Sequence, residues 1–588
     1  MSAKGSIMKK LSEESKEKLL YIIIITLTII LLSRLLYLQV LKGDSYLEQS
    51  KYNSVRMEDL QPIRGKILDR NGVVLAENLP SYDLEIVTED LQDKDRELTF
   101  LSSIIEMEKQ DIENIIKKAN LPIYAHIKIK GGLTEKEVIQ IKEHSFELPG
   151  ITVSTTSKRY YPFKNTAAPI IGFIGPPTKE DLEKDSFYGP NFIIGKQGIE
   201  AEYEKLLRGE KGKEVVQVDA SGRIRDVLDS MPSEPGNNIY LTIDIMLQEE
   251  LETIIGDRKG VAIAIDPNNG EILAMVSHPS FDPNLFVSGI SQQALDKLYA
   301  ENAFINRAVQ GQYPPGSTFK PITLISALNE EIITTKSVIY CRNSIVVGNR
   351  RFKDWIYPSA FGYQNPVQAI ANSSDVFFYT IGLKTGVEKI VKYAKLFGLG
   401  DKTWVDLPTE NTGLVPSMQW KQEYVGENWY PGDTANLSIG QGYLLVTPLQ
   451  MAIMYSGIAK NGIEYTPHFF LKATSQEGSI VEEFTNSILR KIDINNEVLD
   501  TVRDGMEALT NKPDMKILSA YGGNVCAKTG TAEVGETEVN HWLIAFAPHK
   551  KPEIVGLLFF EHSDFPSSHA LAPLMSDLLK KFFSIKSK

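Results

Sequence analysis

Three short segments contain the residues whose types and spacing suit nucleophilic catalysis. Ser317 and Lys320 occur in the run Pro314-Pro315-Gly316-Ser317-Thr318-Phe319-Lys320-Pro321. Residues three apart on a helix share a face, so the Ser317 hydroxyl and the Lys320 amine are expected to be neighbours. A serine becomes a nucleophile when an adjacent base accepts its proton, and a neutral lysine amine is such a base. Pro-Pro-Gly followed by an apolar run predicts a turn that leads into a helix.

The other two segments lie downstream. Ser373-Ser374-Asp375 begins an expected helix over residues 372–383, and Lys528-Thr529-Gly530-Thr531 begins an expected strand that precedes the apolar strand 542–547. Ser-x-x-Lys alone is a weak pattern, because it also occurs at residues 6–9 and 15–18. Lys-Thr-Gly recurs at residues 384–386, but there it ends a helical run, and we interpret Gly386 as a C-cap glycine. A carboxylate-binding motif is expected on a sheet edge, which favours Lys528.

Composition limits the function classes. The chain has 588 residues, enough for two or three domains, and 42% hydrophobic with 23% charged residues indicates a globular protein. A net charge of −12 without a basic, aromatic-rich stripe excludes nucleic acid as a main partner. Cys341 and Cys526 are the only cysteines, too few for a cysteine zinc site or a disulfide framework. One disulfide between them remains an alternative, but two buried free thiols are favoured.

Residues 19–41 form an apolar run long enough to span a bilayer. Five lysines precede it, which predicts a cytoplasmic tail over residues 1–18 and an extracytoplasmic remainder. A cleaved signal peptide is the alternative. It is less favoured because its apolar core is usually shorter and no small-x-small site follows Leu41.

The pattern of expected strands and helices divides the rest of the chain into two parts. Residues 42–236 alternate short strands and helices, which predicts an α+β pedestal with an inserted head lobe at about 85–155. Its glycine-rich run 195–200 lacks the ending of a phosphate loop and is interpreted as a structural turn. Residues 237–588 read as an α/β domain whose hairpin 260–277 and late strands around Lys528 are expected to close one sheet beside Ser317. His562, Asp564 and His569 fit no common zinc spacing, so no metal site is predicted.

Together these motifs resemble the class B penicillin-binding proteins, monofunctional serine transpeptidases, although the same trio also marks class A β-lactamases. Asp375 in the Ser373-Ser374-Asp375 motif and the amino-acid sequence of residues 429–450 resemble the elongation-type branch more than the division branch. The resemblance covers nearly everything after residue 19, including residues 64–72, 195–209, 241–244, 429–434, 439–442 and 447–450. It implies an α/β transpeptidase domain with a central antiparallel sheet flanked by helices, an N-terminal α+β pedestal of the dimerisation type and one transmembrane helix.

The resemblance also implies a mechanism. Ser317 would attack the penultimate D-alanine carbonyl of a peptidoglycan stem peptide, Lys320 would be the general base, and Ser373 would relay a proton to the leaving amine. Asp375 would hold Lys320 and Ser373 in position. The backbone N–H groups of Ser317 and Thr531 would form the oxyanion hole. The substrate carboxylate would be bound by Lys528, Thr529, Gly530 and Thr531.

No cofactor is implied. The implied partners are the membrane, lipid II-derived glycan with its stem peptides, β-lactams as covalent inhibitors and a SEDS-family glycan polymerase. Three alternatives remain open: a division- or sporulation-type transpeptidase, a D,D-carboxypeptidase or β-lactamase-like hydrolase, and a non-catalytic partner of a glycan polymerase. The β-lactamase hypothesis is weakened by the predicted anchor and by the long N-terminal region.

Overall fold

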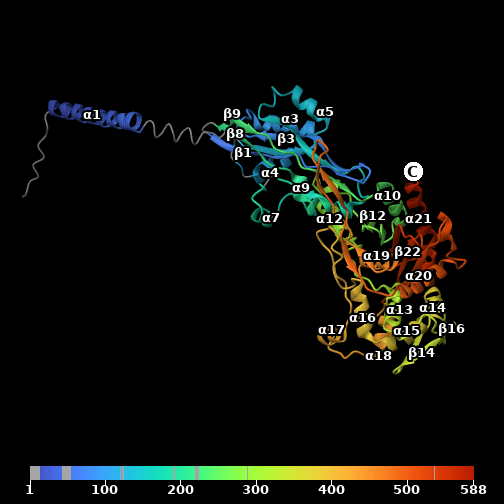
Figure 1. Cartoon of the computed structure of the whole chain (residues 1–588). Helices are drawn as coiled ribbons and strands as arrows, with labels where there is room; N and C mark the ends of the chain where they lie inside the picture. Colours follow the sequence, from blue (N-terminus) through green and yellow to red (C-terminus); the bar gives the residue numbers. More distant parts are fainter. Residues whose placement is uncertain are drawn as a thin grey trace, which may run out of the picture.

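The computed structural model describes residues 13–42, 55–119, 121, 123, 125–189, 192–218, 224–287, 289–535 and 537–587 (Figure 1). The first element is helix α1 (Glu13–Leu36), which the short π-helix η1 (Tyr37–Leu41) continues. Residues Glu17–Leu41 have a mean hydropathy of 2.5, and none of this stretch is buried inside the protein. The apolar helix predicted at residues 19–41 is therefore present. The Ser-x-x-Lys pattern at residues 6–9 and most of the expected tail lie outside the described residues.

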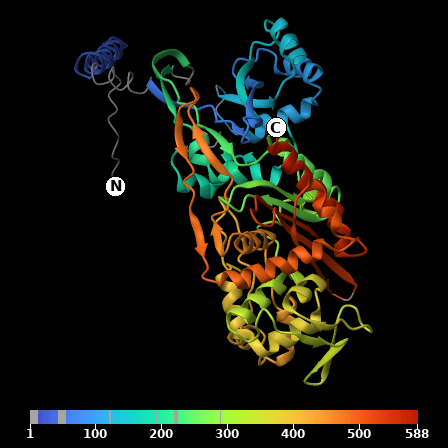
Figure 2. The same ribbon diagram turned by 45° about the vertical axis from the view of Figure 1, so that its right-hand side comes forward.

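Two sheets build the pedestal. A three-stranded antiparallel sheet has the order β1-β8-β9, and a seven-stranded sheet has the order β19-β18-β10-β2-β3-β4, with β5 also paired to β3. The seven-stranded sheet includes β18 and β19, which come from much later in the chain, and these two strands run along the pedestal in Figure 2. The strands are β1 (Val55–Leu60), β2 (Ile67–Leu68), β3 (Val74–Val87), β4 (His126–Gly131), β5 (Ile151–Tyr160), β8 (Gly212–Val218), β9 (Ile224–Met231), β10 (Asn238–Leu241), β18 (Phe470–Thr474) and β19 (Ile480–Glu483).

The head lobe is a separate small core. Apolar side chains from the ends of β3, β4 and β5 pack against α3 (Lys94–Ile105), α4 (Lys109–Ala119) and α5 (Glu135–Glu143). Thr134 caps α5 in a reciprocal capping box with Glu137. Glu106 follows α3, adopts a left-handed conformation and separates α3 from α4.

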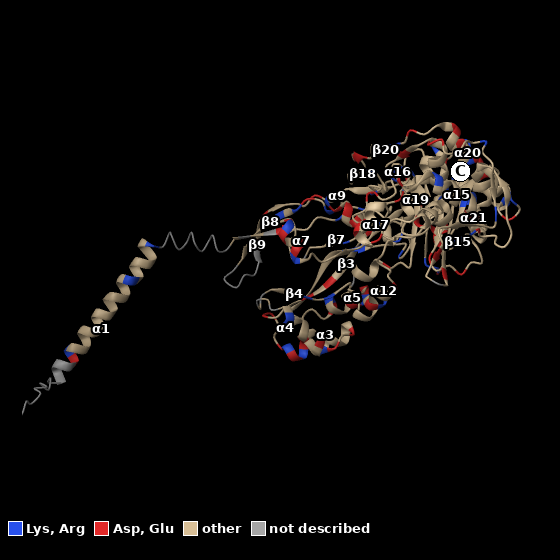
Figure 3. Cartoon of the chain, turned by 90° about the horizontal axis from the view of Figure 1, so that it is seen from below, with Lys and Arg blue, Asp and Glu red and all other residues tan. Residues whose placement is uncertain are grey.

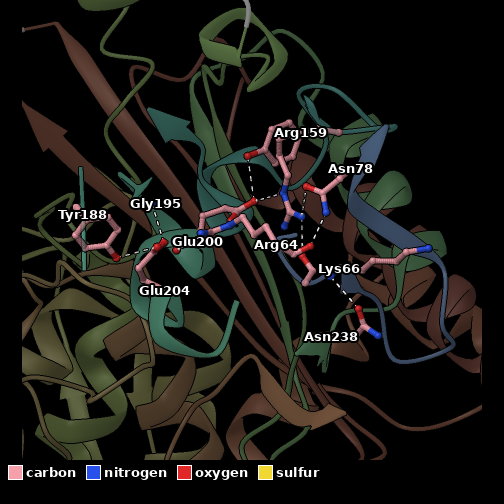
Figure 4. A network of polar contacts seen from close by, with 11 residues as sticks. Arg64, Lys66, Asn78, Arg159, Tyr188, Gly195, Glu200, Glu204 and Asn238 are labelled. Carbon is pink, nitrogen blue, oxygen red and sulfur yellow. Dashed lines mark hydrogen bonds and ion pairs between the residues drawn. The ribbon is translucent and has the colours of Figure 1, made fainter. Parts of the chain in front are cut away.

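A buried ionic network joins the pedestal segments (Figure 4). The Arg64 Nε atom donates to Glu200 at 2.6 Å, and the Arg159 Nε atom donates to the other oxygen of Glu200 at 2.8 Å. Arg64 also pairs with Glu204 at 2.7 Å, and Tyr161 donates to Glu200 at 3.0 Å. Burial alone would raise the pKa of Glu200, but Arg159 and Arg64 hold it below its usual value. The Arg64-Gly65 and Gly195–Gly209 segments thus act together as a structural link.

The glycine-rich run 195–200 belongs to this link. A Cβ on Gly195 would lie 2.0 Å from the backbone oxygen of Glu200, so only glycine allows this close approach. The run is a structural turn, as predicted. The surrounding short elements are α6 (Ala168–Ile171), β6 (Ile174–Gly175), α7 (Lys179–Lys184), β7 (Ile194–Gly195), α8 (Gly198–Glu202) and α9 (Glu204–Arg208).

The C-terminal half is built on an antiparallel five-stranded sheet with the order β12-β11-β23-β22-β21. The hairpin of β11 (Gly260–Ile265) and β12 (Ile272–His278) joins the late strands through the pairing of β11 with β23 (Ile554–Phe560), and β22 (Glu538–Ala547) and β21 (Cys526–Val534) follow, so early and late strands close one sheet as the sequence predicted. Both faces of the sheet are covered. One packs on α10 (Ile245–Ile255) and α21 (Ala572–Lys586), and the other faces α13 (Lys320–Asn329), α19 (Pro448–Ala459) and α20 (Asn496–Thr510).

A mainly helical region completes this half. It includes α14 (Pro366–Asn372), α15 (Asp375–Thr385), α16 (Val387–Leu396), α17 (Met418–Tyr424) and α18 (Pro431–Ser438), with small strands β13 (Ile339–Cys341), β14 (Ser344–Val347), β15 (Arg350–Lys353) and β16 (Gly362–Gln364). Gly386 follows α15 with φ +83°, which confirms that Lys384-Thr385-Gly386 is a helix end. The remaining elements are α11 (Asn284–Val287), α12 (Gln292–Ala300), β17 (Ile463–Tyr465), β20 (Ile488–Lys491) and the 3-10 turns η2 (Gly316–Phe319), η3 (Lys516–Tyr521) and η4 (Ser568–Leu571).

Charges are distributed without a dominant stripe. Basic and acidic residues are interspersed along the folded part of the chain in Figure 3. Cys341 and Cys526 are both buried free thiols, as favoured from the sequence.

Candidate active site

The Ser317 segment lies against the edge strand β21. Ser317 is in the 3-10 turn η2, and α13 begins at Lys320, so the predicted helix starts with one tighter turn. Gly316 has φ +54°, and a Cβ there would lie 2.6 Å from the Thr531 backbone oxygen. A Cβ on Gly440 would lie 2.1 Å from the Gly316 oxygen, and Gly316 donates its N–H to Gly440 at 2.9 Å. Glycines therefore allow three backbone segments to meet beside the serine.

Lys320 points from α13 toward the start of α15. Its Nζ atom donates to Asp375 Oδ1 at 2.7 Å, to the Ser373 carbonyl at 2.6 Å and to the Ser373 Oγ atom at 3.1 Å. The Lys320 side chain is fully buried. Asp375 thus contacts Lys320 directly and supplies a negative charge beside the buried amine.

Ser373 lies between two helices. It ends α14 in a left-handed conformation with φ +54°, and Ser374 then caps α15 by accepting the Phe377 N–H. The predicted helix start is present, preceded by a short helix that was not predicted. The left-handed turn presents both the carbonyl and the hydroxyl of Ser373 to Lys320.

Lys528 approaches Ser373 from the sheet. Its Nζ atom donates to the Ser373 Oγ atom at 3.0 Å and to the Thr529 carbonyl at 2.9 Å. Burial lowers the pKa of Lys528 well below its usual value, and the positive charge of Lys320 lowers it further. The Ser373 hydroxyl therefore bridges two buried amines.

The residues after Lys528 line the edge of the sheet. Thr529 and Gly530 are buried, whereas Thr531 is exposed and its hydroxyl donates to Ser568 at 3.3 Å. A Cβ on Gly530 would lie 2.9 Å from the Thr318 side chain, so β21 and η2 are in close contact. All eight residues that the sequence analysis named for the site therefore come from three segments that meet at one place.

Asp354 was missed by the sequence analysis. Its Oδ2 atom accepts the Ser374 hydroxyl at 2.9 Å and the Val376 N–H at 3.0 Å, so it supports the start of α15. Burial raises the pKa of Asp354, the Val376 N–H opposes this, and Asp375 adds to it. A sequence signal existed, because Asp354 is the single acidic residue between Glu331 and Asp375.

The histidines that were set aside have separate partners. His562 pairs with Glu538 at 2.7 Å, His569 with Asp514 at 2.6 Å, and Asp564 with Arg258 at 3.4 Å. His541 forms a hydrogen bond with Ser563 at 2.9 Å. Cys526 contributes to the main hydrophobic core, which supports its packing role.

Comparison with known proteins matches two family models. Residues 260–580 match the penicillin binding protein transpeptidase domain, and residues 59–241 match the penicillin-binding protein dimerisation domain. The chain belongs to the penicillin-binding protein transpeptidases. The expected elongation-type serine D,D-transpeptidase and its α/β fold with a pedestal are thereby confirmed. The apolar N-terminal helix fits a membrane-anchored member of this family.

Individual relatives span nearly the whole chain. The peptidoglycan D,D-transpeptidase MrdA of Escherichia coli K12 is 32% identical over 585 residues, which cover 95% of this chain and 92% of the relative. A complex between penicillin-binding protein PBP2 and MreC from Helicobacter pylori aligns with a TM-score of 0.81 at 30% identity, covering 91% of this chain and all of that one. A chain from a structure of a peptidoglycan synthase complex, described as coordinating polymerization and crosslinking, aligns with a TM-score of 0.71 at 28% identity, covering 97% of this chain and 98% of that one.

Proposed function

We propose that this transpeptidase cross-links peptidoglycan stem peptides through an acyl-enzyme on Ser317. The observation that supports this most directly is the position of the Ser373 hydroxyl, which accepts hydrogen bonds from both Lys320 and Lys528. Lys320 itself lies three residues after Ser317 in the chain. A hydroxyl between two amines can pass a proton from one to the other without leaving the site.

The proton balance follows from this bridge. Lys320 is paired with Asp375, and the lowered pKa of Lys528 favours its neutral amine. When a substrate carboxylate binds beside Lys528, its negative charge favours the ammonium form there. Lys320 then gives a proton to Ser373 Oγ while Ser373 passes its own proton to Lys528. Substrate binding thereby leaves Lys320 neutral and able to act as the base.

Acyl transfer then proceeds in two steps. Ser317 Oγ bonds to the carbonyl carbon of the penultimate D-alanine and Lys320 accepts the serine proton. The C–N bond to the terminal D-alanine breaks as Ser373 delivers a proton to the leaving amine. In the second step an acceptor amine of another stem peptide displaces Ser317, whose oxygen recovers a proton. The Ser317 and Thr531 N–H groups are the proposed oxyanion donors, each typically worth ~3 kcal/mol.

The test is intact-mass spectrometry after incubation with benzylpenicillin, followed by peptide mapping. We expect one stable adduct on Ser317 and none on Ser317→Ala. An adduct that persists in Ser317→Ala would remove Ser317 as the nucleophile. Rapid release of hydrolysed penicillin would favour the hydrolase alternative.

The cellular setting is part of the proposal. The lysine-rich N-terminus is assigned to the cytoplasm and the folded part to the outer side of the membrane, where peptidoglycan is assembled. A SEDS-family glycan polymerase is the proposed partner. The structural relative described as coordinating polymerization and crosslinking supports this partnership. Co-purification of the two proteins from membranes, lost when residues 1–41 are replaced by an unrelated anchor, would test it.

A further inference from the structure

A row of aromatic side chains leads away from the catalytic group. Trp355 donates its indole N–H to the carbonyl of Asn372, the residue before Ser373, at 3.1 Å. Its ring lies 5.9 Å from that of Phe361, and Tyr363 lies 4.9 Å from Tyr340 across the β13–β16 pair. Phe361 packs in part against the core and is followed by Gly362 at φ +72°, so it links the exposed Trp355 ring to the start of the strand that carries Tyr363. We call Trp355, Phe361, Tyr363 and Tyr340 the aromatic strip.

Three of the four rings in the strip are open to solvent, whereas Phe361 is half-buried against the core. Trp355 is 61% exposed, Tyr363 72% and Tyr340 55%. Neighbouring exposed aromatic rings form an apolar patch on the surface, and such patches mark sites that bind a ligand or a partner. The faces of aromatic rings carry partial negative charge, and they attract the C–H groups of a pyranose ring.

The strip lies in a basic segment of an acidic protein. Residues 332–374 contain five basic residues and one acidic residue, although the whole chain carries a net charge of −12. The acidic residue, Asp354, is buried, so it does not offset the surface charge. The basic residues are all exposed and form no ion pair within the described part of the chain: Lys336, Arg342, Arg350, Arg351 and Lys353.

The surface is at the end of the folded part farthest from the membrane helix. The chain leaves α1 shortly before β1, so the sheet β1-β8-β9 is the membrane-proximal end. The strands β14 and β16 lie at the opposite end in Figure 1 and Figure 2. A ligand that reaches this end comes from outside the membrane surface, as an existing wall strand does.

We infer that the aromatic strip and the basic segment around it bind a glycan strand of existing peptidoglycan and the carboxylates of its stem peptides. The inference rests on the proposed function, because it assigns a docking surface to the substrate of that site. The rings bind the sugar rings and the arginines bind the acidic peptides. The strand is thereby held with one stem peptide at Ser373. A protein partner fits less well, because the segment that carries the three exposed rings also carries five exposed basic residues without an ion pair in the described part of the chain.

The test uses the full-length protein in detergent, first acylated with benzylpenicillin so that the catalytic cleft is blocked. Co-sedimentation is measured with sacculi freed of other wall polymers, and binding to the soluble glycan strands that an amidase releases from them is measured by pull-down on beads to which those strands are coupled. One variant combines Tyr340→Ala with Tyr363→Ala, and a second combines Arg350→Ser with Arg351→Ser. The matched controls are Tyr299→Ala, another exposed tyrosine, and Lys550→Ser with Lys551→Ser, another exposed basic pair.

The aromatic rings and the arginines should contribute differently to binding of the two glycans. The tyrosine variant should bind both glycans about tenfold more weakly, equivalent to ~1.4 kcal/mol. The arginine variant should lose about as much on intact sacculi but little on stripped glycan, and its defect should shrink as salt rises. Wild-type binding by both variants, or equal losses in the controls, would overturn the inference. Penicillin acylation of the variants is measured separately, so a failure of the proposed function would appear there instead.

Discussion

Replacing Ser373 by alanine tests the central claim about the site. The substitution removes the one atom that both lysines contact, and it keeps the Ser373 carbonyl that Lys320 also uses. Lys320 retains two partners, Asp375 and that carbonyl, whereas Lys528 retains the Thr529 carbonyl. The loss should therefore fall mainly on Lys528 and on proton transfer between the two amines.

The size of the effect follows from the contacts. A hydrogen bond from a charged donor contributes ~1.5–3 kcal/mol, and one such bond is lost fully while a second is partly replaced. We expect the acylation barrier to rise by ~3 kcal/mol, which slows acylation about 100-fold. The leaving-group step should suffer as well, because no hydroxyl remains to deliver the proton.

The assay is the second-order rate of labelling by a fluorescent penicillin, with thermal unfolding measured in parallel. Ser326→Ala is the matched control, since Ser326 is a buried serine on the same helix as Lys320 whose hydroxyl donates to Thr323 at 2.8 Å. Labelling of Ser373→Ala within about threefold of wild type, less than 1 kcal/mol, would refute the bridging role. An equal loss in Ser326→Ala would point to a packing effect instead.

Three further predictions follow from buried groups. Glu200→Gln leaves Arg64 and Arg159 without their shared carboxylate, so it should lower the free energy of unfolding by ~3–5 kcal/mol in denaturant titrations; a loss below about 1 kcal/mol would contradict the network. Gly440→Ala forces a Cβ toward the Gly316 oxygen at φ +77°, so labelling of Ser317 should slow while the α1 anchor still retains the protein in membranes; unchanged labelling would contradict the close approach. Burial raises the pKa of Glu464 to about 8 against the opposing charge of Arg490, so the folded state keeps a proton that the unfolded state releases above about 4.5. Wild type should therefore lose stability relative to Glu464→Gln as the pH rises from about 4.5 to about 8, and a constant difference in unfolding free energy would refute this.

Local features of the chain were predictable from the sequence, because they depend on neighbouring residues. The 3-residue spacing of Ser317 and Lys320, the helix start at Asp375, the strand after Cys526 and the helix end at Gly386 follow from periodicity, capping and turn chemistry. The apolar span at residues 19–41 follows from length and hydropathy alone.

The tertiary structure decided how these segments meet. The bridge from Lys320 through Ser373 to Lys528, the buried support from Asp354 and the contact of Gly440 with Gly316 join residues that are far apart in the chain. No local pattern encodes such contacts, because they arise when the hairpin β11–β12 pairs with β23 and brings β21 against η2. The sequence by itself determined which groups carry the chemistry. Packing of distant strands and helices determined which amine faces which hydroxyl, since burial and charge pairing are satisfied only in the assembled fold.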